Sequence, residues 1–163
     1  MAYRLECLGR LLLLHEGRPL AAFAGHRQKL AFLAVLATDP EQRVARDRLL
    51  GLFWPERDEG SARHSLSQLL YEVRSELGDA LDADRGSVRL RPDSWTCDVR
   101  EFREAVEAGA WERAAELYRG HFLEGVQLSG PAGLEHWADG ERAELRRLHR
   151  QAMRALLARA RAA

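Results

Sequence analysis

The sequence predicts an α+β protein in two parts, a small mixed unit followed by an all-helical segment. Apolar and polar residues alternate near the N-terminus, three segments of helical period follow, and a turn-rich hairpin comes next. Beyond Pro92 the apolar residues recur only with a helical period. We therefore expect two domains, residues 1–92 and residues 93–163.

The composition indicates a globular protein whose charges are balanced. The chain has 163 residues, of which 46% are hydrophobic, and this is enough to build packed cores. Its 25 basic and 25 acidic residues give no net charge, and residues 1–92 carry 14 basic and 13 acidic side chains. Any contact with nucleic acid must therefore come from locally clustered charge.

The sequence carries no membrane, metal or disulfide signal. No run of about 18 apolar residues occurs, and the first residues lack the apolar stretch of a secretory signal. Cys7 and Cys97 have no C-x-x-C or C-x-x-H spacing around them. We interpret both as small core residues, and we expect a soluble cytoplasmic protein with no cofactor, no metal and no membrane contact.

The first 55 residues predict a small antiparallel sheet followed by two helices. Residues 3–14 have strand character, and residues 16–19 supply a turn. Residues 26–37 have a helical period, with one apolar face formed by Leu30, Leu33, Ala34 and Ala37. A short second helix is predicted over residues 46–53, before Pro55, and Val44 lies in a short extended link ahead of it.

A third and longer helix is predicted over residues 58–77. Asp58 can cap its N-terminus, and Gly78 ends it where left-handed backbone costs little. A projection at 100° per residue places the apolar side chains on one stripe, formed by Ala62, Leu66, Leu69, Leu70, Val73 and Leu77. The opposite side is polar and carries Ser61, His64, Ser67, Gln68, Tyr71 and Ser75, with Arg63 and Arg74 at its edges.

A β-hairpin follows the third helix. Turn-forming residues 82–87 lie between two short apolar stretches, with Val88 and Leu90 facing inward and Arg89 and Arg91 facing outward. A sheet, three helices and a basic hairpin in this order are the plan of a winged helix. After Pro92 we expect one helix up to Gly109, a second around residues 111–118, and a third from about residue 134 to residue 161.

The ordered set of segments resembles the antibiotic-pathway regulators of streptomycetes and their relatives, the SARP family. The stretches that carry the resemblance in the first part are R-L-E-C-L-G (4–9), K-L-A-F-L-A-V-L-A (29–37), R-D-R-L-L-G-L-F-W-P (46–55) and A-R-H-S-L-S-Q-L-L-Y-E-V-R-S-E-L-G (62–78). Those in the second part are D-V-R-E-F (98–102) and G-A-W-E-R-A-A-E-L-Y-R-G-H-F-L-E-G (109–125).

The resemblance implies an OmpR-type winged helix-turn-helix domain followed by a bacterial transcriptional activator domain (BTAD). Residues 109–118 also resemble the second helix of a tetratricopeptide repeat (TPR), in which small Ala114 allows close approach while Trp111 and Tyr118 fill the groove beside it. The segment after Pro92 is shorter than such activator domains usually are, so we expect a short or truncated one. The resemblance further implies a transcriptional activator, with two copies that pair on direct-repeat promoter sites and engage RNA polymerase.

The polar side of residues 58–77 is the candidate recognition surface for double-stranded DNA, because a helix fits the major groove. Arg63, His64 and Gln68 are the candidate base readers, since arginine pairs with guanine and glutamine with adenine. Contacts with the DNA backbone are expected from Arg27, Lys29, Arg46, Ser67, Tyr71, Arg74, Arg85 and Arg89. The alternative is a solvated polar face, with the hairpin arginines balanced by Asp82 and Asp84.

The loop between the second and third helices is a candidate contact with RNA polymerase. By similarity to OmpR-type regulators this role would fall to Glu56, Arg57, Asp58 and Glu59. The alternative is a solvated linker, and in either case we expect Trp54 in the core.

An enzyme and a protein-interaction adaptor are the two alternatives to a DNA-binding protein. Catalysis is not expected, because the sequence has no nucleophile elbow, no phosphate-binding glycine loop and no metal-spaced ligands. A protein-interaction adaptor is the stronger alternative, since winged helices and TPR-like helices can both bind proteins. The zero net charge favours the adaptor, whereas the basic polar face of the third helix favours DNA.

Overall fold

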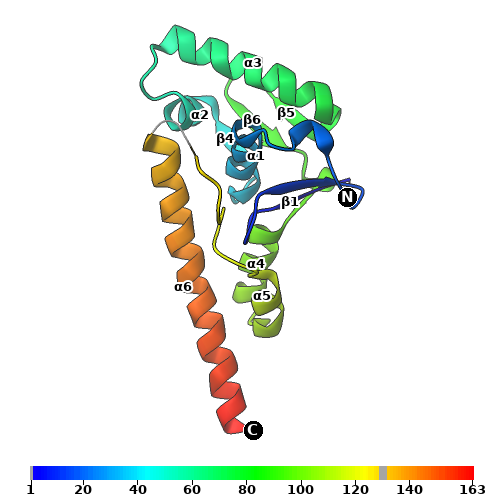
Figure 1. Cartoon of the computed structure of the whole chain (residues 1–163), viewed down its shortest axis with the longest axis vertical. Helices are drawn as coiled ribbons and strands as arrows, with labels where there is room; N and C mark the ends of the chain where they lie inside the picture. The colour runs from blue at the N-terminus through cyan, green and yellow to red at the C-terminus, as the bar shows by residue number, and fades with distance from the viewer. Residues whose placement is uncertain (1, 129–131) are drawn as a thin grey trace.

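The computed structural model describes residues 2–128 and 132–163, and it confirms the α+β class. Figure 1 shows the fold, coloured along the chain from the N-terminus to the C-terminus. The strands are β1 (Tyr3–Glu6), β2 (Leu12–His15), β3 (Arg18–Pro19), β4 (Arg43–Ala45), β5 (Leu81–Ala83), β6 (Ser87–Leu90) and β7 (Trp95–Cys97). The α-helices are α1 (Arg27–Thr38), α2 (Arg46–Phe53), α3 (Glu59–Leu77), α4 (Asp98–Glu107), α5 (Trp111–Leu117) and α6 (Ala132–Ala162).

Helix α1 is the centre of the core. The predicted single apolar face is too narrow, because every residue from 31 to 38 is buried. The reason is that α1 contacts β1 of the first sheet, β4 and β6 of the second, and α4 of the helical segment. The small side chains Ala31, Ala34 and Ala37 allow these neighbours to approach from different sides.

Helix α3 is amphipathic, as predicted. All six residues of its apolar stripe are buried, whereas the predicted polar side is exposed. Asp58 caps the helix as expected, since its Oδ1 accepts a hydrogen bond from the Ser61 backbone N–H at 2.8 Å. Gly78 has the expected positive φ of 56°, but its ψ of −129° is not left-handed helical, because the chain continues directly into a 3₁₀ turn over Gly78–Ala80.

The hairpin is part of a three-stranded sheet in the order β4-β6-β5. Strands β5 and β6 form the predicted hairpin, with Val88 and Leu90 buried. The extended link around Val44 is itself a strand, because β4 pairs antiparallel with β6 and sets Val44 opposite Val88. The wing sheet is thereby attached to the residue that starts α2.

The N-terminal sheet contains a strand from beyond Pro92, which the sequence did not indicate. Its order is β3-β2-β1-β7, and β7 runs parallel to β1 with Leu5 opposite Cys97. Trp95 of β7 is buried, and its indole Nε1 donates to the Ala80 carbonyl at 2.9 Å. The chain therefore enters its helical segment from within the first sheet.

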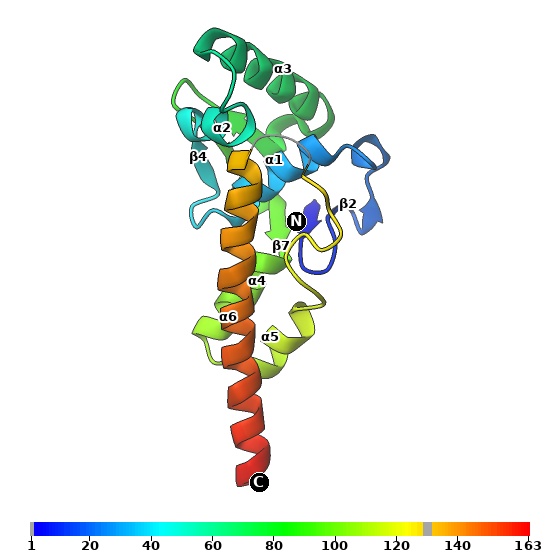
Figure 2. The ribbon, with the colours of Figure 1, turned by 60° about the vertical axis from the view of Figure 1, so that its left-hand side comes forward.

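The helical segment lies on the side of the core away from α3. Figures 1 and 2 show α6 starting beside α2, passing α4 and α5, and ending at the opposite end of the molecule from α3. The start of α6 is tightly docked, because a Cβ on Gly133 would lie 2.9 Å from the Gly51 carbonyl oxygen. No helix in the described part of the chain is long and apolar enough to cross a membrane.

The buried carboxylate of Glu6 links the first sheet to the helical segment through hydrogen bonds with arginines. Its carboxylate receives hydrogen bonds from Arg119 at 2.7 Å, from Arg4 at 3.2 Å and from Arg10. Burial raises the pKa of Glu6, but the hydrogen bonds from Arg119, Arg10 and Arg4 outweigh burial and lower the pKa to about 2. The carboxylate is therefore charged at neutral pH and holds together segments far apart in the sequence.

A close backbone contact lies beside this cluster. Gly9 has a φ of 90°, and its N–H donates to the His121 carbonyl at 2.9 Å. Gly120 faces it so closely that a Cβ on Gly120 would lie 2.7 Å from the Cα of Gly9. Only glycine fits this position without moving one of the two backbones.

We expect Glu6 to make the fold acid-sensitive. Because its folded-state pKa lies below the ordinary value of 4.5, its stabilisation is complete above pH 4.5 and is lost as the pH falls towards 2. Glu6→Gln should lower the free energy of unfolding at pH 7 by roughly 1–3 kcal/mol. It should also make the free energy of unfolding fall less between pH 4.5 and pH 2 than it does in the wild type. Urea unfolding at a series of pH values measures both effects. Equal acid loss in Glu6→Gln and in the exposed control Glu135→Gln would contradict the assignment.

Gly120→Ala should destabilise the protein by roughly 1–3 kcal/mol, because the added methyl group must push apart two backbone segments. Gly140 is the matched control, since it lies inside α6 and a Cβ added to it would meet nothing within 4 Å. Gly140→Ala should stabilise the protein by about 0.5–1 kcal/mol through better helix propensity. Urea unfolding checks both values, and a harmless Gly120→Ala would refute the close contact.

Candidate nucleic-acid interface

The exposed side of α3 brings the three candidate base readers onto one surface. Arg63, His64 and Gln68 are all exposed, and the helical segment covers none of them. Arg63 forms an ion pair with Glu59 one turn earlier, with Nη2 and Oε1 2.5 Å apart. Such an exposed pair contributes little to stability and exchanges readily for another anion. The side chains on this surface are therefore available to a ligand.

The candidate backbone contacts on α3 lie along one edge of the same surface. Ser67, Tyr71 and Arg74 are exposed, and Tyr71 retains 77% of its surface. Its aromatic ring can bury apolar surface when a partner binds, and its hydroxyl can form a hydrogen bond. Tyr71 and Arg74 line a hollow of about 460 Å³ together with Arg46 of α2 and Ala83 of β5.

The wing projects Arg85 from the tip of the β5–β6 hairpin. Asp84 organises the tip, because its Oδ1 accepts hydrogen bonds from the backbone N–H groups of Gly86 at 2.8 Å and Ser87 at 2.7 Å. These bonds lower the pKa of Asp84. Among the described residues, the Arg85 side chain has no hydrogen bond or ion pair. Asp84 is thus engaged by the turn itself, and Arg85 remains free to meet an anion.

Arg89 is less free than the sequence suggested. Its guanidinium donates to Asp82 at 3.0 Å, and Arg91 approaches the same carboxylate at 3.6 Å. The hydrogen bond from Arg89 is the main cause of the lowered pKa of Asp82. The alternative of a locally balanced hairpin therefore applies to Arg89 but not to Arg85. Arg43 of β4, which the sequence reasoning missed, lies opposite Arg89 in the register and is exposed.

A hollow of about 530 Å³ separates the start of α3 from the wing. Its lining includes Arg63 and Ser67 of α3, Arg46 of α2 and Arg85 of the hairpin. Three arginines that are distant in sequence thus converge on one concave surface. The positions of these arginines in the sequence did not indicate that they converge, because their convergence depends on the pairing of β4 with β6.

Two candidates near the start of α1 are engaged elsewhere. The Lys29 Nζ lies 3.5 Å from the Glu72 carboxylate of α3, and the lysine side chain keeps only 21% of its surface exposed. The exposed Arg27 donates to the Gln127 carbonyl at 3.4 Å. Lys29 therefore connects α1 to α3, and Arg27 connects α1 to the segment before α6.

The loop from Trp54 to α3 is exposed at all four candidate polymerase-contacting residues, Glu56, Arg57, Asp58 and Glu59. Arg57 donates to the Ser65 hydroxyl at 2.5 Å, and Asp58 caps α3. Trp54 is buried, as expected. Two of the four residues thus hold the loop against the helix, Glu59 pairs with Arg63 at the start of α3, and Glu56 is exposed.

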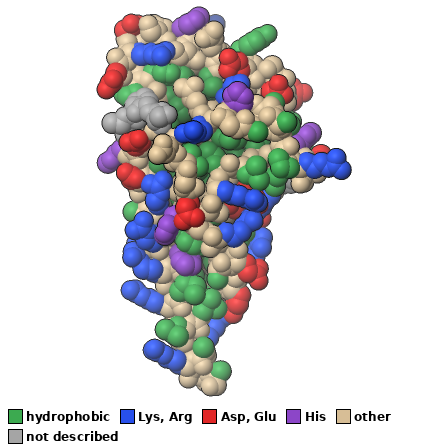
Figure 3. Space-filling view, in the orientation of Figure 1, with side chains coloured by type: hydrophobic (Ala, Val, Ile, Leu, Met, Phe, Trp, Pro, Cys, Tyr) green, Lys and Arg blue, Asp and Glu red, His purple; other side chains and the backbone are tan. Residues whose placement is uncertain are grey.

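A second basic surface escaped the sequence reasoning. Residues 145–163 contain six arginines and no acidic residue. Figure 3 shows Lys and Arg side chains along the outer side of α6. Arg146, Arg150 and Arg154 of this helix are exposed and follow one another at intervals of four residues. Because this part of α6 lies at the far end of the molecule from α3, these arginines do not belong to the α3 surface.

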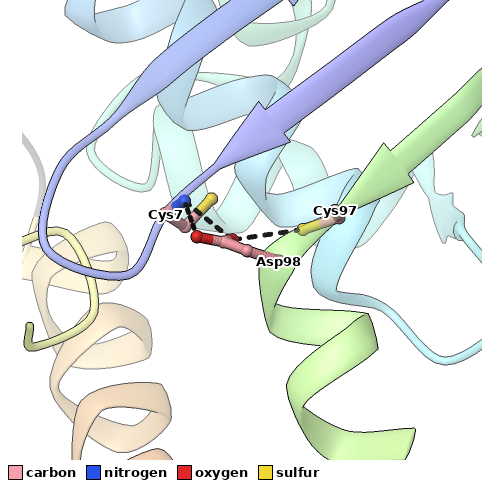
Figure 4. A group of neighbouring side chains, drawn as sticks. All are labelled: Cys7, Cys97 and Asp98. Carbon is pink, nitrogen blue, oxygen red and sulfur yellow. Dashed lines mark hydrogen bonds between the residues drawn. The ribbon is translucent and has the colours of Figure 1, made fainter. Parts of the chain in front are cut away.

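One group of metal-ligating side chains comes together among the described residues, namely Cys7, Cys97 and Asp98 (Figure 4). The buried Asp98 carboxylate already accepts backbone N–H bonds from Cys7 at 2.8 Å and Leu8 at 2.9 Å. Contact with Cys97 and burial raise the pKa of the Cys7 thiol well above its usual value. The cluster is suited to joining β1 to the start of α4, and its protonated thiol and occupied carboxylate are poor metal ligands.

The fold and this surface define a winged helix-turn-helix protein with a helical segment behind it. Comparison with solved structures agrees: the chain superimposes on EmbR of Mycobacterium tuberculosis, determined in complex with a low-affinity phosphopeptide, with a TM-score of 0.68. Identity is 26%, and the match covers 99% of this chain and 47% of that one. EmbR is a SARP-family regulator, and the chain has the SARP-type fold that the sequence resemblance predicted.

The chain spans about half the length of the EmbR chain that it matches. No protein-family model matches the sequence, and no curated protein sequence matches it.

Proposed function

We propose that the protein is a sequence-specific DNA-binding transcriptional regulator that activates its target promoters. Helix α3 enters the major groove, and the hairpin over residues 81–90 acts as the wing. The observation that carries this proposal is that the polar side of α3 is exposed beside the wing, while the helical segment docks on the other side of the core. A duplex can therefore approach both elements at once.

Base reading is assigned to Arg63, His64 and Gln68. Gln68 can donate to N7 of adenine and accept from its N6 amino group, and Arg63 can donate twice to guanine. Arg63 would exchange its pairing with Glu59 for the base edge. Tyr71, Ser67 and Arg74 face the strand backbone, and Arg85 faces the phosphates beside the minor groove, where negative potential concentrates.

The remaining candidates have supporting roles in this proposal. Lys29 and Arg27 brace α1 against α3 and the segment before α6, and either can also reach a flanking phosphate. Arg89 contributes positive charge to the wing through its shared pair with Asp82. Of the two proposed domains, residues 1–92 contact DNA and residues 93–163 contact partner proteins.

The proposal includes partners that the SARP-type fold suggests. Two copies would bind direct-repeat promoter sites in the cytoplasm, without catalysing a reaction. RNA polymerase would meet the acidic loop that holds Glu56 and Glu59, which lies next to α3 on the promoter side. The helical segment supplies further surface for the second copy or for polymerase.

A protein-interaction adaptor is the second candidate function, and the zero net charge of the chain favours it. In that case the exposed Tyr71 and the polar side of α3 would bind a protein partner. The two functions differ in their response to salt, because only DNA binding releases a condensed counterion layer.

Duplex DNA selected from a random pool should bind with an affinity that falls as salt rises. Each phosphate neutralised by arginine or lysine contributes about 0.9 to the slope of log affinity against log salt concentration. Fluorescence anisotropy at several salt concentrations measures this slope. Arg85→Ala should reduce the magnitude of the slope by about 0.9, the contribution of one phosphate contact. Arg154→Ala on distant α6 should leave the slope unchanged. Absence of binding at low salt would remove the DNA proposal in favour of the adaptor.

Alanine at Gln68 or at Arg63 should relax sequence preference rather than weaken all binding equally. Each lost bidentate contact should cost roughly 1–3 kcal/mol on the preferred duplex and much less on a scrambled one. Competition binding with both duplexes measures the difference, and circular dichroism checks that α3 remains folded. A uniform loss on both duplexes would show that these side chains touch phosphate and do not read bases.

A further inference from the structure

Arg46 lies where α2, α3 and the wing meet. It is the first residue of α2 and follows directly on β4 of the wing sheet. It is half-buried and lines both hollows between α3 and the hairpin. From its place at a helix N-terminus, the sequence predicted a phosphate contact for Arg46. In the structure its hydrogen bonds go to the hairpin.

The side chain and the backbone of Arg46 both bind the hairpin. The guanidinium Nε donates to the Asp84 carbonyl oxygen at 2.6 Å, and the backbone N–H donates to the Gly86 carbonyl at 3.0 Å. Both acceptors belong to the turn that presents Arg85. The Nε hydrogen bond is the one that depends on the identity of residue 46, since any residue except proline keeps the backbone bond.

The Asp84 carbonyl is a suitable point at which to hold the wing. The same residue closes the hairpin, because its backbone N–H donates to the Ser87 carbonyl at 3.0 Å and its carboxylate accepts from Gly86 and Ser87. A side chain that holds Asp84 therefore holds the whole tip. Since α2 contacts α3, this bond sets the distance between Arg85 and the recognition surface of α3.

We propose that Arg46 is a positioning residue that clamps the wing tip to α2 and so aligns Arg85 with α3 for simultaneous contact with one duplex. This inference rests on the proposed function for its effect on DNA binding, but the clamp itself is a property of the free protein. An aligned wing binds without first losing conformational freedom, which is why the clamp strengthens binding.

Two substitutions separate positioning from phosphate contact. In Arg46→Gln the amide nitrogen occupies the place of the arginine Nε along the side chain, so the hydrogen bond to Asp84 can be kept while the charge is lost. In Arg46→Lys the charge is kept, but a methylene group occupies that place and the donor is displaced. The clamp predicts that the glutamine variant behaves more like the wild type, whereas a phosphate contact predicts the same of the lysine variant.

The first measurement is amide hydrogen exchange in the free protein. Exchange at Gly86 and Ser87 should become about tenfold faster in Arg46→Lys, as expected for loss of one charge-assisted hydrogen bond, and should change less in Arg46→Gln. Arg48→Gln removes a charge from an exposed position of the same helix and should leave exchange at the tip unchanged. Wild-type exchange in Arg46→Lys would overturn the clamp, whatever the protein binds.

The second measurement is affinity for the selected duplex by fluorescence anisotropy. Arg46→Lys should weaken binding about tenfold more than Arg46→Gln, with a salt slope equal to that of the wild type. The reverse order, with a slope reduced by about one contact in Arg46→Gln, would overturn the proposal in favour of a phosphate contact. If the wild type binds no DNA, the proposed function fails, and hydrogen exchange alone decides the clamp.

Discussion

Burial of the apolar stripe of α3 determines both the packing of the core and the surface that this helix presents. Six side chains at helical spacing enter the core, so the polar side of the same helix must face outward. Turning the helix about its axis would expose Leu66 and Val73 and bury Arg63 and Gln68 without partners. The cost of burying those polar groups fixes which surface a duplex would meet. The core and the proposed interface therefore depend on one amphipathic pattern.

The two parts of the chain are joined more closely than a linker would join them. Strand β7 pairs with β1, Asp98 accepts backbone N–H groups after β1, and Glu6 binds Arg119 beyond α5. Together with the docking of Gly133 on α2, these contacts fix the helical segment on the face away from α3. A partner bound to that segment would thus be held at a defined place relative to the proposed DNA surface.

The elements that depend on local pattern were predictable from the sequence, and those that depend on long-range pairing were not. The stripe of α3, its Asp58 cap and the hairpin over residues 81–90 follow from helical period, capping and turn chemistry. Strand β7 is three residues long and pairs with a strand some ninety residues earlier, so no local signal marks it. The same reason explains why residues 31–38 of α1 are all buried, since the neighbours of α1 include β1, β6 and α4, which are far apart in the sequence.

In the candidate site, too, some features could be predicted from the sequence and others could not. Exposure of Arg63, His64 and Gln68 was predicted correctly, because it follows from the period of a single helix. The Arg89–Asp82 pair corresponds to the balanced hairpin that the sequence offered as the alternative. The Lys29–Glu72 pair and the bond from Arg46 to Asp84 were not foreseen, because each joins two elements that are distant in the sequence. Whether these residues contact DNA stays a prediction.

Site-specific photo-cross-linking measures whether the polar side of α3 lies against a duplex. Tyr71 would be replaced by p-benzoylphenylalanine, a similar aromatic residue, and Met153 of α6, which is also exposed, would carry the same replacement as the matched site. Contact between α3 and DNA predicts a covalent adduct with the selected duplex on irradiation of the residue 71 variant and none from the residue 153 variant. An adduct from residue 153 alone, or bound duplex without an adduct from residue 71, would contradict it.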